Sequence, residues 1–354
     1  MKRTISFGPY GRRSFSGNQQ IPDDNTVPSN LASLKQRLNI QPQKNGVLFL
    51  SAPKELTHNE KFYDARYRLD QPDFLPGKGL LKALRVRGAD FSLPFLEIGS
   101  GTDSLSFGLL EENPYPIALL TDPSFELIKV LRQKLQKNKL DDPDIHLAVL
   151  EAEEINQLPE NAFSLIALRS TLHHILDVPK FINDSSYLLT KGGFLAFEEP
   201  CLEGFVLMGT MAQFLPLVME KSGFSLKEEQ KTKIDNFVQT MKYYARRDLD
   251  KASMEDKHLF RPDEIMKICV SSGFAVEFIP NVTFDGYLEL GESADNFFSF
   301  HNFFRDYLKY CIGFDHELLN LFEKHFEPYN RFTEDISAKN NAPYCYSIFF
   351  CRKL

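Results

Sequence analysis

A glycine-rich turn flanked by carboxylates is the part of this sequence best equipped for chemistry. Residues 95–110 contain a short apolar stretch, a turn with Gly99 and Gly101, and the first residues of a predicted helix. Such a turn brings a ligand against unpaired backbone amides at a helix N-terminus. Asp122 ends the next apolar run, at roughly the ~20-residue spacing at which an acidic side chain accepts ribose hydroxyls. The pattern favours a nucleoside-containing ligand over the alternative of an ordinary strand-to-helix turn.

The acidic residue ahead of the turn indicates which cofactor to expect. Glu97 lies two residues before the first glycine, close to where a dinucleotide would place its pyrophosphate. A carboxylate there would repel the phosphates, but it would attract S-adenosylmethionine, which has no phosphate and carries a positive amino group and a sulfonium. Ser104 also stands where a dinucleotide fingerprint has its third glycine. The turn therefore predicts S-adenosylmethionine as the cofactor.

Alternating strands and helices are needed to bring these residues to one edge of a sheet. The predicted strands are the apolar runs at residues 95–98, 117–121, 145–150, 163–168, 194–197, 274–279 and 344–351. Most of these runs are nearly continuous, as expected for strands whose two faces are covered by helices. We expect an α/β fold with a Rossmann-like, mostly parallel seven-stranded sheet, helices on both faces and helical lid insertions.

The chain divides into four predicted parts. These are an N-terminal extension (1–60), the cofactor-binding core (61–200), a helical insertion or lid (201–260) and a completing segment (261–354) with a Phe-rich insertion at about 285–340. Within the core, residues 61–90 look helical in pieces broken by Pro72, Pro76 and Gly77. Within the lid, residues 226–256 are predicted to be helical throughout.

Composition excludes several classes of function. The 354-residue chain has a net charge of −7, so we expect no nucleic acid partner, because phosphate binding needs a basic surface. Five scattered cysteines at no zinc-type spacing predict reduced thiols and no metal site.

Residues 1–20 lack the apolar core of a signal peptide, which indicates a cytoplasmic protein; an organelle transit segment at residues 1–22 is the alternative. The apolar run 204–219 is shorter than the ~20 residues of a membrane span, so we expect none.

The order of these motifs resembles the class I S-adenosylmethionine-dependent methyltransferases. It is closest in style to the small-molecule branch that includes the ubiquinone and menaquinone biosynthesis enzymes. Four segments carry the resemblance: residues 96–102, residues 121–124, residues 151–159, and residues 163–177 taken together with 188–200.

The resemblance implies a set of cofactor-binding residues. Glu97 would hold the amino group, Asp122 the ribose hydroxyls, and Glu151 with the Ala152 amide the adenine edge. The other implied positions are Gly99, Ser100, Gly101 and Thr102 in the turn, Pro123 after Asp122, Arg169 and Ser170 near the sulfonium, and Tyr63 and Tyr67 in an aromatic segment that closes over the cofactor. Asp103 replaces the family's usual third glycine, and Glu151 replaces the commoner Asp.

Candidate catalytic residues follow the fourth and fifth predicted strands. Methyl transfer is an in-line displacement, so a base is needed only if the acceptor must lose a proton. His173, His174 and Glu199, with Glu198 beside it, lie where such sheets place their ligands. Structural roles for the two histidines are the alternative.

We therefore expect a methyltransferase that modifies a small metabolite with apolar or aromatic bulk, at oxygen rather than carbon or nitrogen. The apolar run 204–219 and the aromatic run 297–304 are predicted to roof the acceptor, unless they form extra core or a homodimer seam. Two other hypotheses stay open at this point: a non-methylation reaction on the same fold, and a catalytically silent binding scaffold.

Overall fold

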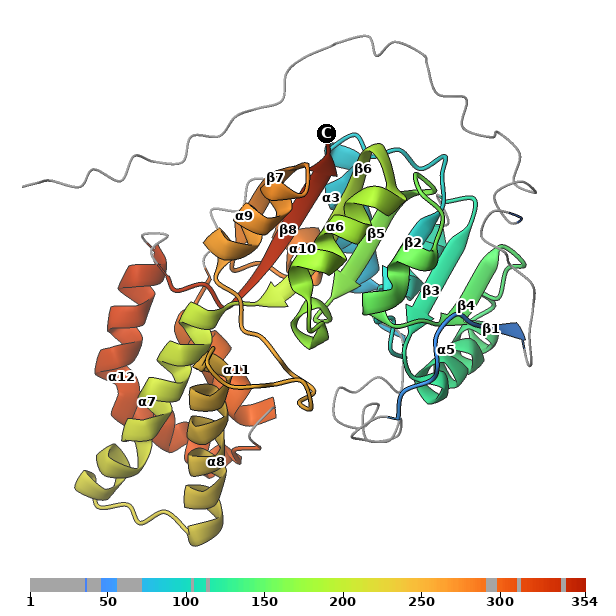
Figure 1. Ribbon diagram of the computed structural model, residues 1–354. Helices are drawn as coiled ribbons and strands as arrows, with labels where there is room; N and C mark the ends of the chain where they lie inside the picture. Colours follow the sequence, from blue (N-terminus) through green and yellow to red (C-terminus); the bar gives the residue numbers. More distant parts are fainter. Residues whose placement is uncertain are drawn as a thin grey trace, which may run out of the picture.

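The centre of the molecule is a single mixed β-sheet. The computed structural model describes residue 36 and residues 46–55, 72–102, 105–112, 115–290, 298–310, 313–338 and 342–354. Within them, eight strands form the sheet in the order β1-β4-β3-β2-β5-β6-β8-β7 (Figure 1). The strands are β1 (Val47–Phe49), β2 (Phe95–Ile98), β3 (Ala118–Asp122), β4 (Ile145–Val149), β5 (Phe163–Arg169), β6 (Leu189–Pro200), β7 (Phe274–Pro280) and β8 (Tyr346–Lys353).

Parallel pairing brings the predicted site residues to one edge of the sheet. Strands β1 to β6 run parallel to their neighbours, whereas β8 lies antiparallel between β6 and β7. Asp122 pairs with Val149, and Arg169 pairs with Glu198, so the carboxyl ends of β3 and β4, and of β5 and β6, are level. The strand order reverses between β2 and β5, the position at which open α/β sheets form a ligand crevice.

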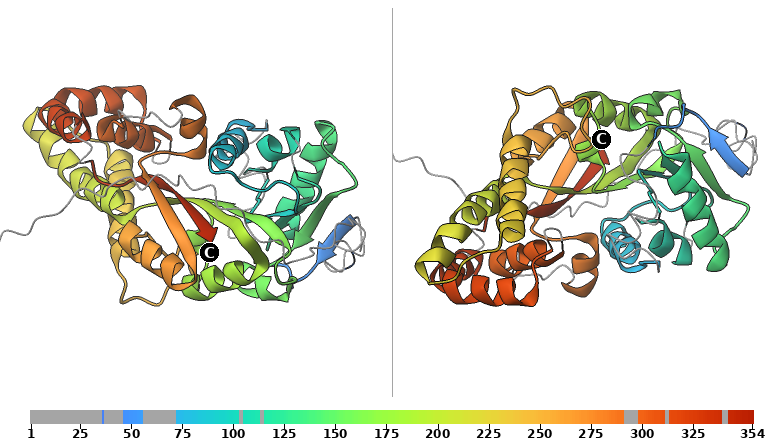
Figure 2. Two further views of the ribbon diagram at one scale, coloured as in Figure 1. Left: turned by 90° about the horizontal axis from the view of Figure 1, so that it is seen from above. Right: turned by 90° about the horizontal axis from the view of Figure 1, so that it is seen from below.

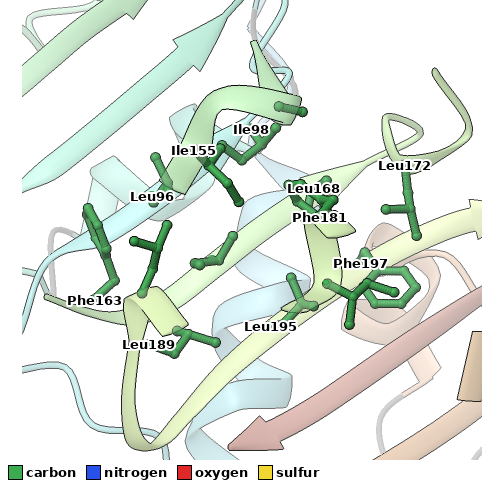
Figure 3. Close-up of a cluster of buried hydrophobic side chains, with 14 of the residues drawn as sticks. Leu96, Ile98, Ile155, Phe163, Leu168, Leu172, Phe181, Leu189, Leu195 and Phe197 are labelled. Carbon is green, nitrogen blue, oxygen red and sulfur yellow. The ribbon is translucent and has the colours of Figure 1, made fainter. Parts of the chain in front are cut away.

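Helices cover both faces of the sheet (Figure 2). One face carries α3 (Leu75–Val86), α4 (Ser106–Glu112), α5 (Phe125–Lys137) and α10 (Phe284–Leu290). The other carries the 3-10 helix η2 (Ala152–Gln157), α6 (Val178–Leu188) and α9 (Pro262–Ser271). On this second face, side chains from β2, β5 and β6 meet Ile155 of η2 and Phe181 of α6 (Figure 3). Burial of these apolar side chains supplies the main stabilising free energy of the two layers.

The predicted fold class is confirmed, but the predicted strand count is wrong. The described residues form eight strands, because the apolar stretch that begins at Val47 adds a short strand at the sheet edge. Val47 pairs with Leu147 in parallel register, and the side chains of Val47 and Leu48 are buried. Three residues give too short a period for the sequence to indicate a strand.

Two local predictions also need correction. Pro76 begins α3 instead of breaking it, because the first turn of a helix needs no backbone donor at that position. Gly77 lies inside the same helix, where an added Cβ would come within 2.3 Å of the Leu105 carbonyl oxygen of the neighbouring chain segment. β6 begins directly after α6 and continues through Gly192 to Pro200, so it is much longer than the predicted strand at 194–197.

A helical unit lies beside the sheet (Figure 1). It consists of α7 (Leu202–Lys221), α8 (Glu228–Ala245), α11 (Phe300–Tyr310) and α12 (His316–Ala338), whose buried side chains form one hydrophobic cluster. The predicted helix at 226–256 is wrong in its second half, because α8 ends at Ala245. The Asp250 carboxylate there accepts a hydrogen bond from the Ala252 amide, a turn that competes with helix.

The helix α7 is the one described helix that is long and apolar enough, by length and composition alone, to cross a membrane. Its Met208, Ala212 and Leu215 side chains are buried in the helical unit, whereas Phe214 and Leu217 are exposed. The absence of a membrane span stays a prediction.

Candidate functional site

The glycine turn follows β2 and depends on two left-handed glycines. Gly99 has φ +68° and Gly101 has φ +55°, values that favour glycine. An added Cβ at Gly99 would lie 2.3 Å from Thr171 Cγ2, whereas a Cβ at Gly101 would have no heavy atom of the described residues within 4 Å. The turn is therefore closed by Thr171 on one side and open at Gly101, where a ligand can approach the backbone.

The Glu97 carboxylate points to the beginning of α4. Its Oε1 accepts the Leu105 amide at 2.8 Å, its Oε2 accepts the Ser106 hydroxyl at 2.8 Å, and the side chain is fully buried. A carboxylate at a helix N-terminus also interacts favourably with the helix dipole. Glu97 thus holds α4 against the turn; its predicted contact with the cofactor amino group stays a prediction.

Asp122 lies beside the turn, at the end of β3. Its Oδ2 accepts the Gly101 amide at 3.0 Å and its Oδ1 accepts the Ser124 amide at 2.8 Å. Burial raises the pKa of the Asp122 carboxyl to about 6, although these two backbone hydrogen bonds act in the opposite direction. Each carboxylate oxygen can still accept a further hydrogen bond, so the arrangement fits ribose hydroxyls. Ser100 and Thr102 are buried, and the Ser100 amide donates to the Thr121 carbonyl.

A segment that the sequence did not assign to the site lies over the ends of β3 and β4. The Lys54 amide donates to the Pro123 carbonyl at 2.9 Å, and Lys54 Nζ forms an ion pair with Glu151 Oε2 at 2.6 Å. The Ser51 hydroxyl accepts the Glu151 amide at 3.0 Å. Ala152 is buried at the beginning of η2. Glu151 and Ala152 therefore lie together after β4. Their contact with adenine stays a prediction, and Lys54 is an additional candidate there.

Arg169 and Ser170 end β5 beside a second carboxylate. Arg169 Nε lies 3.5 Å from Glu198 Oε1 and its guanidinium lies 3.6 Å from Asp285 Oδ1. Burial acts to lower the pKa of Arg169, but the charges of Glu198 and Asp285 raise it above its usual value. Ser170 has φ +48°, and its amide donates to the Glu198 carbonyl. Burial raises the pKa of the Glu198 carboxyl, whose Oε2 also accepts the Phe284 amide at 2.6 Å.

Glu199 ties the loop after β5 to β6. This fully buried carboxylate accepts the Thr171 amide at 2.8 Å and the Leu172 amide at 2.6 Å through Oε1. Its Oε2 lies 2.6 Å from His173 Nδ1, which donates to it. Since Thr171 also closes the glycine turn, Glu199 connects the turn to the two predicted catalytic histidines.

The histidines meet a carboxylate that the sequence did not single out. Asp256 Oδ1 lies 3.4 Å from His173 Nε2 and 3.3 Å from His174 Nδ1. The Tyr244 hydroxyl donates to Asp256 Oδ2 at 2.6 Å, and His174 Nδ1 lies 2.9 Å from the Glu255 carbonyl oxygen. Asp256 reaches this place because its irregular segment bonds to the sheet edge, where the backbone amides of residues 257 and 258 donate to the His173 carbonyl.

The two histidines differ in charge. Burial acts to lower the pKa of His173, but the charge of Glu199 and hydrogen bonds to Asp256 and Glu199 raise it to about 9. Burial and the neighbouring His173 lower the pKa of His174 to about 4. Without another cation in the cluster, His173 is therefore the charged member at neutral pH and His174 is the neutral one.

The predicted aromatic roof is divided between two roles. Phe300 and Phe304 are fully buried in the core of the helical unit, which matches the extra-core alternative. A group of rings at the margin of the same cluster, which we call the aromatic wall, joins α7, α11 and the beginning of β8 through ring-centroid distances of 5.5–6.4 Å. It consists of Phe205, Phe303, Tyr307 and Tyr346. Tyr346 pairs with Pro200, so this wall lies next to the carboxyl end of β6.

Some predicted positions fall outside the part of the chain that the structure describes. Tyr63 and Tyr67 lie there, as do Asp103 and Ser104 of the glycine turn. All other predicted site residues lie at the carboxyl ends of β2 to β6 or directly after them. The residues that sequence reasoning missed are Lys54, Thr171 and Asp256, none of which has a sequence signal of its own.

Comparison with known protein families gives a match to part of the chain. Residues 96–197 match the family model described as a methyltransferase domain. A comparison with curated proteins gives no match.

Several solved structures are similar to the chain. One is phosphoethanolamine N-methyltransferase 2 of Haemonchus contortus, in complex with phosphomonomethylethanolamine and S-adenosylhomocysteine (14% identity, TM-score 0.44, 78% of this chain); the present chain spans about half of it, 52%. A second is a putative sarcosine dimethylglycine methyltransferase from Galdieria sulphuraria (11%, TM-score 0.48, 83% of this chain and 97% of that one). A third is the [4+2]-cyclase SpnF (12%, TM-score 0.42, 91% and 92%).

Proposed function

We propose that the S-adenosylmethionine-dependent class I methyltransferase domain around residues 96–197 transfers a methyl group to a hydroxyl oxygen of a small metabolite. The observation that carries the proposal is the open glycine turn beside buried Asp122, inside the segment that matches a methyltransferase domain. When bound, S-adenosylmethionine supplies an electrophilic methyl group on a sulfonium.

The residues around the turn fit this cofactor. Gly101 leaves room for a ligand against the backbone, and Asp122 can accept two ribose hydroxyls. Glu151 and Ala152 lie at the end of the next strand, where the adenine ring would bind. Arg169 is the one cationic side chain among the predicted contacts, and we propose that Glu198 and Asp285 hold it in place near the methionine part of the cofactor.

We further propose that the acceptor lies between the aromatic wall and the two histidines. A hydroxyl oxygen must lose its proton to become a good nucleophile, and the neutral His174 imidazole and the Asp256 carboxylate beside it are groups that can accept that proton. Glu199 is a positioning residue, because it acts on the loop and on His173 from a fully buried place. The aromatic wall favours an acceptor with apolar or aromatic bulk, such as the phenols or quinols of the ubiquinone and menaquinone branch that the sequence resembles.

The helical parts at residues 201–260 and about 285–340 are proposed to act as a lid over this acceptor. Their helices α7, α8, α11 and α12 share one hydrophobic cluster beside the carboxyl edge of the sheet. They would exclude water from the methyl-transfer step, which depends on alignment and desolvation.

A binding and product experiment tests the function. Calorimetry with S-adenosylhomocysteine should give a saturable one-site isotherm that Asp122→Asn weakens. Glu228→Gln, a change at an exposed side chain of α8, should leave it unchanged. Incubation with S-adenosylmethionine and a panel of hydroxylated aromatic compounds should add one methyl group to one acceptor, with magnetic resonance placing it on oxygen. No heat of binding would overturn the cofactor site, and a methyl group found on carbon or nitrogen would overturn the choice of oxygen.

A further inference from the structure

Two imidazoles and a carboxylate converge beside the glycine turn. One ligand atom from each of His173, His174 and Asp256 lies within 4.8 Å of the other two. Asp256 Oδ1 is 3.4 Å from His173 Nε2 and 3.3 Å from His174 Nδ1. The three side chains come from two segments far apart in the sequence, so the fold assembles the cluster.

The spacing matches the coordination shell of a small divalent cation. Zinc-type ions bind nitrogen and carboxylate oxygen at about 2.0–2.2 Å, so neighbouring ligand atoms of a tetrahedral site lie about 3.3–3.5 Å apart. Both distances from Asp256 Oδ1 to the imidazoles, 3.4 Å and 3.3 Å, fall within this range. His174 Nδ1 also donates to the Glu255 carbonyl oxygen at 2.9 Å, so the ion would have to displace the proton of this hydrogen bond. The three atoms would occupy one face of the polyhedron and leave at least one position for another ligand.

The surroundings of the cluster are those of a supported metal site. His173 donates Nδ1–H to Glu199 at 2.6 Å, which leaves Nε2 directed toward Asp256. Such carboxylate–histidine contacts fix the tautomer and orientation of metal-binding histidines. The Tyr244 hydroxyl similarly fixes Asp256 through Oδ2 and leaves Oδ1 for the cluster.

The charges also balance. Glu199 and Asp256 bring two negative charges to a site in which Glu199 is fully buried and Asp256 is 35% exposed. A divalent cation neutralises both carboxylates and leaves both imidazoles neutral, whereas a single imidazolium neutralises only one of them.

We propose that His173, His174 and Asp256 bind a divalent first-row transition-metal ion. Two imidazoles and one carboxylate form a donor set that suits zinc, iron, cobalt or nickel better than magnesium or calcium. The remaining coordination positions would take water or an oxygen atom of the methyl acceptor. This part of the inference rests on the proposed function: the ion would lower the pKa of an acceptor hydroxyl and hold its oxygen in place.

Cobalt(II) is a suitable probe, because its visible d–d absorption reports binding and coordination. Chelator-treated full-length protein should bind one equivalent of Co2+ and develop this absorption, with Zn2+ competing for the same equivalent. Asp256→Asn and His174→Ala should each lower the affinity by more than tenfold. Glu199→Gln should lower it by about 10- to 100-fold, as for other residues that orient metal ligands.

His258→Gln is the matched control, because this neighbouring histidine belongs to the same segment but bonds to the Ile175 carbonyl instead. It should bind Co2+ like the unaltered protein, and thermal unfolding should establish that every variant is folded. Absence of the one-equivalent absorption change would overturn the proposal, and so would a Co2+ affinity in Asp256→Asn and His174→Ala that equals that of the unaltered protein. Calorimetry with S-adenosylhomocysteine on the same samples separates the two ideas: loss of that binding alone refutes the function and leaves the metal site standing.

Discussion

Gly99→Ala is the substitution whose effect the structure defines most sharply. The new methyl group would lie 2.3 Å from Thr171 Cγ2 and 2.5 Å from Thr171 Oγ1, where ordinary contact begins near 3.4 Å. The residue would also have to keep φ +68°, which disfavours any residue with a Cβ. Both effects act on the turn that faces the cofactor and on the loop that carries the histidines.

The two contributions can be given magnitudes. A left-handed alanine costs about 1–2 kcal/mol, and forcing a methyl group into a packed site costs about 1–3 kcal/mol. We therefore expect Gly99→Ala to lower the free energy of unfolding by about 2–5 kcal/mol. We also expect weaker binding of S-adenosylhomocysteine, because Thr171 can yield only by moving the loop away from the turn.

Gly88→Ala isolates the backbone contribution. Gly88 has φ +66°, but a Cβ there would have no heavy atom within 4 Å. Denaturant unfolding should therefore show a loss of about 1–2 kcal/mol for Gly88→Ala and no change in cofactor affinity. Thr171→Ala removes the two atoms that would clash most closely with the new methyl group. Adding Gly99→Ala to Thr171→Ala should therefore lower the free energy of unfolding by less than Gly99→Ala does in the unaltered protein.

Equal losses of stability in Gly99→Ala and Gly88→Ala would refute this reasoning. If Gly99→Ala costs no more stability than Gly88→Ala, the contact between Gly99 and Thr171 is not tight. If removal of the Thr171 side-chain atoms restores neither stability nor affinity, the turn and the loop are not coupled through this contact.

The remaining predictions concern two buried carboxylates. Because the pKa of Asp122 is raised to about 6 and ribose hydroxyls bind its ionised form, calorimetry should show S-adenosylhomocysteine binding more tightly as the pH rises through 6. We expect roughly tenfold weaker binding one pH unit below that pKa, and a flat profile for Asp122→Asn; a pH slope that Asp122→Asn keeps would contradict the assignment. Glu199→Gln should lower the free energy of unfolding by about 3–5 kcal/mol, because it breaks a buried charge pair, and a loss below about 1 kcal/mol in denaturant unfolding would show that the pair contributes little.

The sequence predicts those parts of the fold that depend on local pattern. The runs that become β2, β3 and β5 are apolar enough to be recognised as buried strands, and Asp122 and Arg169 fall at their ends. Because parallel strands place their carboxyl ends together, the predicted residues at those ends meet at one edge. Their sequence positions alone are enough to predict that edge.

The rest of the site depends on contacts that have no local pattern. Asp256 lies in an irregular segment that was predicted to be helical, and only its hydrogen bonds to the loop after β5 bring it to the histidines. Lys54 meets Glu151 across the sheet edge, from a segment whose short strand β1 is too brief for periodicity to detect. Glu97 shows a different limit, because its residue type is consistent with a cofactor contact and with the helix contact observed here.

The proposed cofactor site and the proposed acceptor site are joined by one short stretch of chain. Thr171 packs on Gly99, while its amide and that of Leu172 bind Glu199. Glu199 in turn binds His173, the residue that follows Leu172. A carboxylate with three donors in a fully buried place has little freedom to rotate, so a shift of the turn must move the histidine cluster with it. Cofactor binding at the turn is therefore expected to set the position of the groups that face the acceptor. Alignment is the main requirement of methyl transfer, and we expect Thr171 and Glu199 to transmit it between the two sites.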